Sequence, residues 1–196
     1  RFFSIFLIVF LGAAVFSGLR NTPGTMKETV DHYLDEHHYA DLTYFASLGF
    51  SQKDIDSIKK TKGIAEMEYG YQVDAQYEYE DAKQQVTVYS SKEYNKSMIN
   101  APDLISGRYP HASGEAIADQ NLAKKGCALG DTITLKNDNA TEKVKIVGII
   151  NDVRYVSKMD RGTSTLGDGT NQGFIEVLNQ TAKDLSIPKT LKKMRK

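Results

Sequence analysis

The residues best suited to metal chemistry in this chain are three histidines set among three carboxylates. They stand in DHYLDEHH, residues 31–38, as His32, His37 and His38. On a helix, however, positions 32 and 37 project about 140° apart, and the i, i+4 histidine spacing that brings two ligands together is absent. We therefore expect this segment to be a solvated helix end without a metal site.

Two further motifs match catalytic patterns only in their letters. The segment Gly162–Gly173 is rich in glycine, but it lacks the Lys-Ser/Thr pair and the following helix that cradle a phosphate. Ser57 and Lys60 fit the S-x-x-K spacing, yet they lie on the polar side of a short predicted helix. The sequence thus predicts neither a nucleotide site nor a serine nucleophile.

Cys127 is the only cysteine, so no disulfide can form within the chain. Nothing beside it in KKGCALG would activate a thiolate, and we expect a small packed residue. The sequence therefore predicts no catalytic, cofactor-binding or metal-binding residue, no cofactor, and a protein that is not an enzyme.

The chain opens with an apolar run, Phe2–Leu19, of 18 residues without a charge. At the rise of a helix this spans about 27 Å, close to the hydrocarbon thickness of a bilayer. The run is apolar on every face, so a transmembrane helix over residues 1–20 is expected. A cleaved secretory signal, with Val15-Phe16-Ser17 as a weak cleavage site, is the alternative.

Pro23-Gly24 is predicted to end this helix, as a stiff link or as a flexible tether. Because no initiator Met is present, the chain is expected to be a fragment. Residues 21–188 carry 18 Lys and Arg against 25 Asp and Glu, a net charge of −7, whereas the tail 189–196 is basic. A mildly acidic domain gives no reason to expect nucleic acid as a partner.

Periodicity predicts the elements of the first half. Residues 26–37 follow a helical pattern, 40–47 alternate as a strand, and Ser51 with Asp54 forms a capping box for a helix that ends at Gly63. The clearest signal is EMEYGYQVDAQYEYE, where apolar residues occupy every odd position from Met67 to Tyr79. This predicts a strand buried on one face, followed by a return strand through Val86 and Val88.

The second half alternates short elements. A strand is predicted at 116–118, and a helix capped by Asp119 and ended by Gly126 follows it. Further strands are predicted at 130–136, 142–150 and 173–178, with turns at 137–139 and at Asp168-Gly169. The order of elements indicates an α+β fold, in one body or two lobes.

Short phrases in a fixed order carry a resemblance to a known family. They are LG at 48–49, GIAE at 63–66, GRYP at 107–110, GEA at 114–116, GDTI at 130–133, IVGI at 146–149, YVSK at 155–158 and RGTST at 161–165. In this order the chain resembles the extracytoplasmic core domain of FtsX/MacB-type ABC transporter permeases, in particular the large-ectodomain type of Gram-positive bacteria. The resemblance covers residues 1 to about 178.

The resemblance implies a mixed α/β extracytoplasmic domain, residues 21–178, behind a first transmembrane helix and at the outer face of the cell membrane. It implies a separate cytoplasmic ABC ATPase as partner, contact with membrane lipid, and a second permease copy or an extracellular protein. Such a domain couples ATP-driven motion to export or extraction of lipid, lipoprotein or peptide cargo.

The end of the chain departs from the family. Residues 179–196, NQTAKDLSIPKTLKKMRK, do not match its continuation and are expected to be a basic tail, with the later transmembrane segments missing. A second hypothesis therefore stays open: a signal-anchored extracellular binding or adhesion domain with no transport role.

Overall fold

The structure is a computed structural model that describes residues 1–46, 49–138, 140–155 and 161–186. It divides into two compact units, Arg1–Glu36 and the domain that begins at His37. Parts of five sequence predictions lie outside the described residues: the end of strand 40–47, Leu48 of the phrase at 48–49, turn residue Asn139, the phrase at 155–158 beyond Tyr155, and the tail after Ser186.

The first unit is one continuous helix, α1 (Phe2–Glu36), and Pro23 lies inside it. The predicted helix end at Pro23-Gly24 is therefore wrong. Inside a helix, proline removes one backbone donor and its ring crowds the carbonyl four residues earlier, which weakens or kinks the helix without always ending it. The Thr22 hydroxyl, beside Pro23, donates to the carbonyl of Gly18 at 2.8 Å. By length and composition α1 could cross a membrane, with a mean hydropathy of 2.4 over its most apolar 18 residues.

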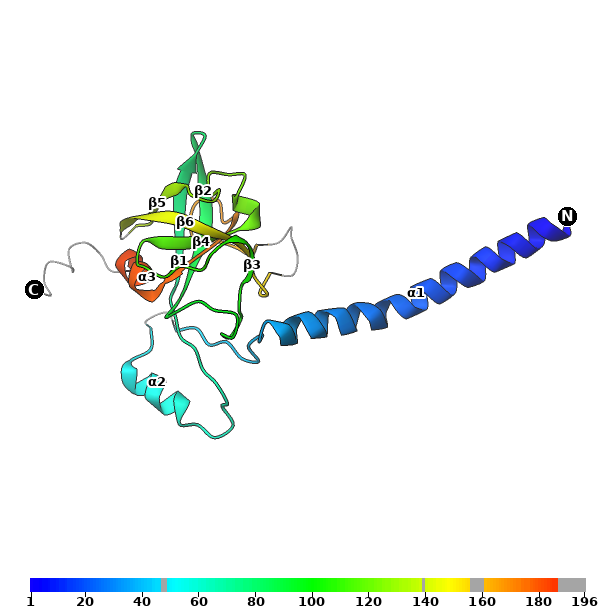
Figure 1. Cartoon of the computed structure of the whole chain (residues 1–196), viewed down its shortest axis with the longest axis horizontal. Coiled ribbons are helices and arrows are strands. Elements are labelled where there is room, and N and C mark those ends of the chain that lie inside the picture. Colours follow the sequence, from blue (N-terminus) through cyan, green and yellow to red (C-terminus); the bar gives the residue numbers. More distant parts are fainter. Residues whose placement is uncertain (47–48, 139, 156–160, 187–196) are drawn as a thin grey trace, which may run out of the picture. The chain divides into compact units, whose positions relative to one another are not determined.

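The domain is built on one mixed sheet of seven strands (Figure 1). The strands are β1 (Gln72–Tyr79), β2 (Ala82–Ser91), β3 (Asp103–Gly107), β4 (Glu115–Asp119), β5 (Thr132–Lys136), β6 (Thr141–Asn151) and β7 (Gly173–Leu178). Their order is β3-β6-β4-β7-β2-β1-β5, and β5 pairs with β6 as well as with β1, which closes the ring. The pairs β2–β7 and β4–β6 are parallel and the others are antiparallel, which confirms the predicted α+β class.

The predicted alternation is confirmed in the second half of its range. In β1, Ala75 and Tyr77 are buried and their even-numbered neighbours are more exposed, as period two requires. The strand returns as β2 through a tight turn at Glu80 and Asp81, whose φ values of +49° and +60° suit a two-residue hairpin. Residues 67–71 are not in a strand, so the predicted element is too long at its start.

The second half agrees with the sequence in its strands. The strands predicted near 116–118, 130–136, 142–150 and 173–178 are observed as β4, β5, β6 and β7. The helix after Asp119 shrinks to one turn, η1 (Gln120–Leu122), although the Asp119 side chain accepts from Asn121 N as a cap should. Strand β3 was not predicted. The last residues of β6, Gly148–Asn151, pair with β3, whereas Thr141–Lys145 pair with β5. The change of neighbour falls near Gly148, where the β4–β6 pairing has a register shift.

Part of the predicted tail belongs to the core. Helix α3 (Asn179–Ser186) follows β7 directly, and its Ala182 and Leu185 are fully buried in the main hydrophobic cluster. The spacing of these two residues places them on one helix face, which packs against the sheet.

Both faces of the sheet are covered, so its central strands are buried throughout. Along β7, Ile175 and Val177 belong to one cluster and Phe174 to the other, as alternate residues of a strand must. In β4, Ile117 lies on the Phe174 side. This second face holds the ionisable residues described below.

Residues 41–71, here called the arm, leave and re-enter the domain and carry α2 (Gln52–Lys59). The predicted capping box is confirmed, since the Asp54 backbone N–H donates to Ser51 Oγ and Asp54 Oδ2 accepts from the Ser51 backbone N–H. Of the predicted strand 40–47, residues 40–46 are not in a strand, and Leu42 and Tyr44 are exposed. An alternating pattern needs a neighbouring strand to bury one face, and none lies beside it among the described residues.

Candidate functional site

The chain enters the domain through a short segment, residues 37–40, here called the strap. His37 follows α1 directly, and its Nδ1 lies 3.0 Å from the carbonyl oxygen of Ala101. Backbone bonds run from Ala101 N to His37 O at 2.9 Å and from Asn100 N to His38 O at 3.0 Å. The Asn100 side chain also accepts from Ala40 N at 3.0 Å. Four hydrogen bonds therefore fix the strap to residues 100–101.

Residues 92–102, here called the locking loop, connect the strap to the sheet. Tyr94 and Met98 are buried in the same cluster as Ala101 and Phe174. The Tyr94 hydroxyl donates to the carbonyl of Val177 in β7 at 3.1 Å. The carbonyl oxygen of Ala101 also contacts His37 Nδ1. The locking loop therefore contacts the strap on one side and β7 on the other.

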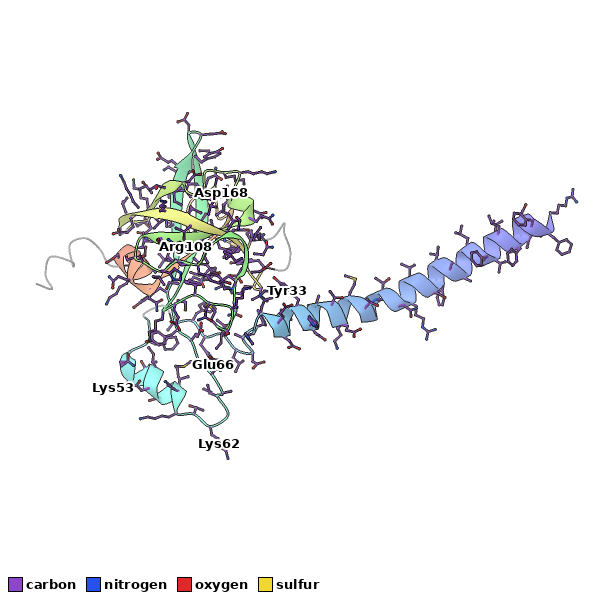
Figure 2. The ribbon with its side chains drawn as sticks, in the orientation of Figure 1. Tyr33, Lys53, Lys62, Glu66, Arg108 and Asp168 are labelled. Carbon is purple, nitrogen blue, oxygen red and sulfur yellow. The ribbon has the colours of Figure 1, made fainter. Side chains whose placement is uncertain are left out.

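The arm is fixed where it returns to the sheet. Tyr71 N donates to Ser90 Oγ at 2.8 Å, and Ser90 N donates to Tyr71 O at 2.9 Å. A side chain on Gly70 would place its Cβ 1.7 Å from the Ser90 carbonyl oxygen, so only glycine allows this approach. Figure 2 shows Lys53, Lys62 and Glu66 along the arm.

A buried ionic network lies on the second face of the sheet. Arg154 donates to Asp152 through Nε, at 2.9 Å and 2.7 Å from the two carboxylate oxygens, and through Nη2 to both Asp152 and Glu176. Its guanidinium carbon lies 3.9 Å from the centre of the Tyr89 ring. The Asp152 side chain is fully buried, that of Glu176 is 1% exposed, and that of Arg154 is 28% exposed.

The pKa values of the two carboxyl groups in this network are shifted in opposite directions. Burial raises the pKa of Asp152, but Arg154 more than offsets this, so the pKa lies below its ordinary value. Burial raises the pKa of Glu176 well above its ordinary value, and Arg154 only partly opposes this because it also faces Asp152. The arrangement thus favours a neutral Glu176 beside an ionised Asp152 and a charged Arg154. In the part of the chain that the structure describes, no donor lies within ordinary hydrogen-bond distance of the buried Glu176 Oε2, which also disfavours a charge on this group.

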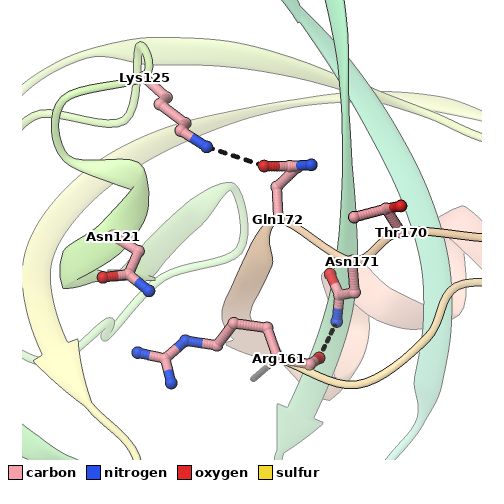
Figure 3. A pocket seen from close by; sticks show the side chains of 6 residues that line it. All are labelled: Asn121, Lys125, Arg161, Thr170, Asn171 and Gln172. Atoms are coloured by element: carbon pink, nitrogen blue, oxygen red, sulfur yellow. Dashed lines mark hydrogen bonds between the residues drawn. The ribbon is translucent and has the colours of Figure 1, made fainter. Parts of the chain in front are cut away.

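A second buried ion pair lies nearby and borders a polar cavity. Arg161 Nε donates to Asp119 Oδ2 at 2.6 Å, and the guanidinium carbon lies 5.7 Å and 5.8 Å from the ring centres of Tyr155 and Phe174. The cavity is lined by Arg161 together with Asn121, Lys125, Thr170, Asn171 and Gln172 (Figure 3).

The histidines named above do not converge. His32 Nδ1 lies 3.9 Å from Glu36 Oε2 on an exposed helix face, whereas His37 faces Ala101. Among the residues that the structure describes, no group of three or more potential ligands is placed to hold a metal ion.

The other motifs also occupy structural positions. The Ser57 hydroxyl donates to the carbonyl of Lys53 at 2.8 Å, and Lys60 caps the end of α2. Cys127 is fully buried, as expected, and burial raises the pKa of its thiol to about 11. The glycine-rich segment leads into β7, a strand, as the sequence indicated.

The functional residues that sequence reasoning missed are those of the strap and the ionic network. One signal was visible: Glu176 stands inside the otherwise apolar strand GFIEVL. A carboxyl group at such a position needs a buried partner. Its partners Asp152 and Arg154 come from another part of the chain and meet it only through folding.

No family model matches the chain, and no curated protein matches it. Solved structures that are similar to it include two domains of ABC-type transporters. The extracellular domain of the noncanonic ABC-type transporter YknZ from Gram-positive bacteria is 13% identical, with a TM-score of 0.47, over 70% of this chain and 67% of that one. The periplasmic region of MacB from Actinobacillus actinomycetemcomitans is 10% identical, with a TM-score of 0.42, over 66% of this chain and 55% of that one. The chain thus spans about half of the MacB region.

Proposed function

We propose that this chain is the membrane-anchored, extracytoplasmic part of an ABC transporter permease, and that it transmits motion and catalyses no reaction. The order of the phrases from GIAE to IVGI supports this reading. The observation that carries it is the continuity of α1, which passes without a break from its apolar run to Glu36 and ends one residue before the first bond of the strap.

Two features, each within its own unit, support mechanical coupling in this proposal: the length of α1 and the hydrogen bonds of the strap. A helix of 35 residues is stiff along its axis, and a glycine linker in its place would absorb any displacement. The strap is then held by four hydrogen bonds to residues 100–101, which belong to the buried side of the locking loop. A movement of the helix end would therefore act on β7 through packed contacts.

In this proposal Phe2–Leu19 crosses the cell membrane, in contact with lipid, and the domain lies outside the cell. A cytoplasmic ATPase of the ABC type hydrolyses ATP, and its motion reaches the domain through the membrane segments of the permease. The cargo is a lipid, a lipoprotein or a peptide. A second permease copy or an extracellular protein completes the assembly.

The alternative is a signal-anchored domain that binds an extracellular partner and has no ATPase. The exposed apolar side chains of the arm, such as Leu42, Tyr44 and Phe45, favour this second reading, because exposed apolar patches mark contact surfaces.

The test is purification of the full chain from its native membranes through a C-terminal tag. Under the first proposal an ABC-type ATPase copurifies, and four residues, Gly-Ser-Gly-Ser, inserted between Glu36 and His37 uncouple transport while the ATPase stays bound. The matched control places the same insertion between Glu80 and Asp81, at the exposed hairpin tip. A chain that copurifies no ATPase, or an insertion at Glu36 that changes nothing, would contradict the coupling role.

A further inference from the structure

A cavity of about 370 Å³ lies beside the start of β7, and the described residues that line it all have polar side chains (Figure 3). They come from three segments far apart in sequence: the turns after β4, the stretch that begins at Arg161, and the residues that precede β7. Among the described residues, the lining contains two cations, three amides and one hydroxyl, without a carboxylate or an apolar side chain. Such a surface cannot bind an acyl chain or another apolar group favourably.

The positive charges at this cavity are fixed in place. Arg161 forms an ion pair with the buried Asp119, and the two charges cancel. The net positive charge of Arg161, Asp119 and Lys125 therefore comes from Lys125. Lys125 Nζ donates to Gln172 Oε1 at 2.8 Å. An ammonium group has three N–H donors, so two remain for a ligand, and the Gln172 amide keeps its NH₂ group as a donor.

The backbone around the cavity is also held firmly. The Tyr77 hydroxyl donates to the carbonyl of Lys125 at 2.6 Å. Asn171 Nδ2 donates to the Arg161 carbonyl at 2.6 Å and to Thr87 Oγ1 at 3.1 Å, and Asn171 Oδ1 accepts from Gly173 N at 3.2 Å. Both N–H groups of Asn171 are therefore used within the protein, and the donors that face a ligand are those of Lys125 and Gln172, carried on this fixed backbone.

We propose that this cavity binds a hydrophilic oxyanion, namely a phosphate or carboxylate group carried on a small hydroxyl-bearing molecule. The net positive charge and the surplus of donors select the anionic group. The volume exceeds that of an inorganic phosphate and lies at the lower end of the range for small-molecule sites. The amides and the hydroxyl of the walls suit a polar remainder. This site is independent of any transport role.

The sequence alone gave the opposite expectation for a phosphate near the glycine-rich segment, because no lysine follows that segment closely. Lys125 reaches Gln172 from 47 positions earlier in the chain. The site therefore differs from a phosphate loop, in which the lysine and a helix start come from the same motif. It gives no reason to expect nucleotide hydrolysis.

The test is calorimetric titration of the full chain in neutral detergent micelles with glycerol 3-phosphate, and with glycerol as the uncharged control. We expect saturable binding of glycerol 3-phosphate that weakens with added salt, and none of glycerol. Lys125→Gln should raise Kd about tenfold or more, since it removes a charged donor. Lys124→Gln is the matched control, because Lys124 is exposed and does not line the cavity.

Two further measurements protect the test against a misfolded variant. Lys125→Arg keeps the charge and should retain binding, and the near-ultraviolet circular dichroism of each variant reports its tertiary packing. No saturable binding at millimolar concentration, equal binding of glycerol, or an equal loss in Lys124→Gln would each overturn the proposal. Loss of the coupling function with this binding intact would leave it standing.

Discussion

Replacement of Arg154 by methionine should destabilise the domain strongly. The change keeps much of the side-chain volume and removes the partner of Asp152, whose side chain is fully buried. Breaking a buried ion pair from one side costs about 3–5 kcal/mol, because the remaining charge is left unpaired. Loss of the contact with the Tyr89 ring adds about 0.5–1 kcal/mol. For a domain with a total stability of about 5–15 kcal/mol, this is a large fraction.

Glu176→Gln should behave differently, although Glu176 is the more buried of the two carboxyl groups. The raised pKa of Glu176 favours its neutral form, and glutamine replaces that carboxylic acid by an amide of the same shape and charge. The amide oxygen can accept the Arg154 bond, and the amide nitrogen can donate to the Asp152 carboxylate, with which the Glu176 side chain interacts. At pH 4.5, before the wild type loses the contribution of Glu176, we expect a change of no more than about 1 kcal/mol.

The pH dependence gives a second, independent readout. The pKa of Glu176 in the folded state is raised above its ordinary value of 4.5, so the folded state binds this proton more tightly than the unfolded chain. Its contribution to stability is fully present below pH 4.5 and is lost as the pH rises through the folded pKa. Glu176→Gln removes this loss, so the variant should gain stability relative to the wild type as the pH rises from 4.5.

The assay is urea unfolding of the full chain in neutral detergent micelles, followed by near-ultraviolet circular dichroism over a pH series. Glu78→Gln is the matched control, since Glu78 is exposed on β1. A Glu176→Gln variant as unstable at pH 7 as Arg154→Met would refute the reasoning, because it would show that Glu176 is ionised in the folded protein.

Three further changes test the fold and the strap. Ala75→Asp should unfold the domain, since an unpaired charge at a fully buried position costs several kcal/mol, whereas Gln72→Asp should leave the melting temperature nearly unchanged. Asn100→Ala should speed hydrogen exchange at Ala40, because it removes the acceptor and places alanine at a φ of +53°. Asn100→Gly also removes the acceptor but tolerates that φ, so its loss of stability should be about 1 kcal/mol smaller. Equal losses of stability in the two variants would exclude backbone strain at this position. Leu185→Ala should cost about 2–5 kcal/mol in urea unfolding, and a smaller loss than 1 kcal/mol would show that α3 is not part of the core.

The sequence predicted those elements that carry their own local signal. Ala75 and Tyr77 face the core because period two admits only one buried face, and the capping box at Ser51 and Asp54 marks a helix start on its own. Predictions failed where a local signal was outweighed. Pro23 usually ends a helix, yet α1 continues through it. Residues 40–46 alternate as a strand would, yet no strand pairs with them among the described residues.

The candidate sites depended on tertiary register and could not be read from spacing. Asp152 follows β6 and Glu176 lies in β7, and these two strands are separated by β4 in the sheet. The distance between the two carboxyl groups is therefore set by two successive pairings, of which β4–β6 contains a register shift. A one-residue change in either pairing would turn Glu176 to the opposite face.

The strap, the locking loop and the ionic network form one connected set of contacts in the domain. His37 contacts Ala101, Ala101 packs in the cluster that contains Phe174, and Glu176 lies two residues further along β7 on the same face. Well-packed apolar side chains at these positions would give the domain equal or greater stability, so the ionic network suggests a role besides stability. Its geometry is directional, because Arg154 must face two carboxyl groups at once, and a close-packed core transmits a shift instead of absorbing it. The face that receives the strap thus combines an apolar cluster with one directional ionic network, and under the proposed coupling role a displacement at His37 would have to be matched by both.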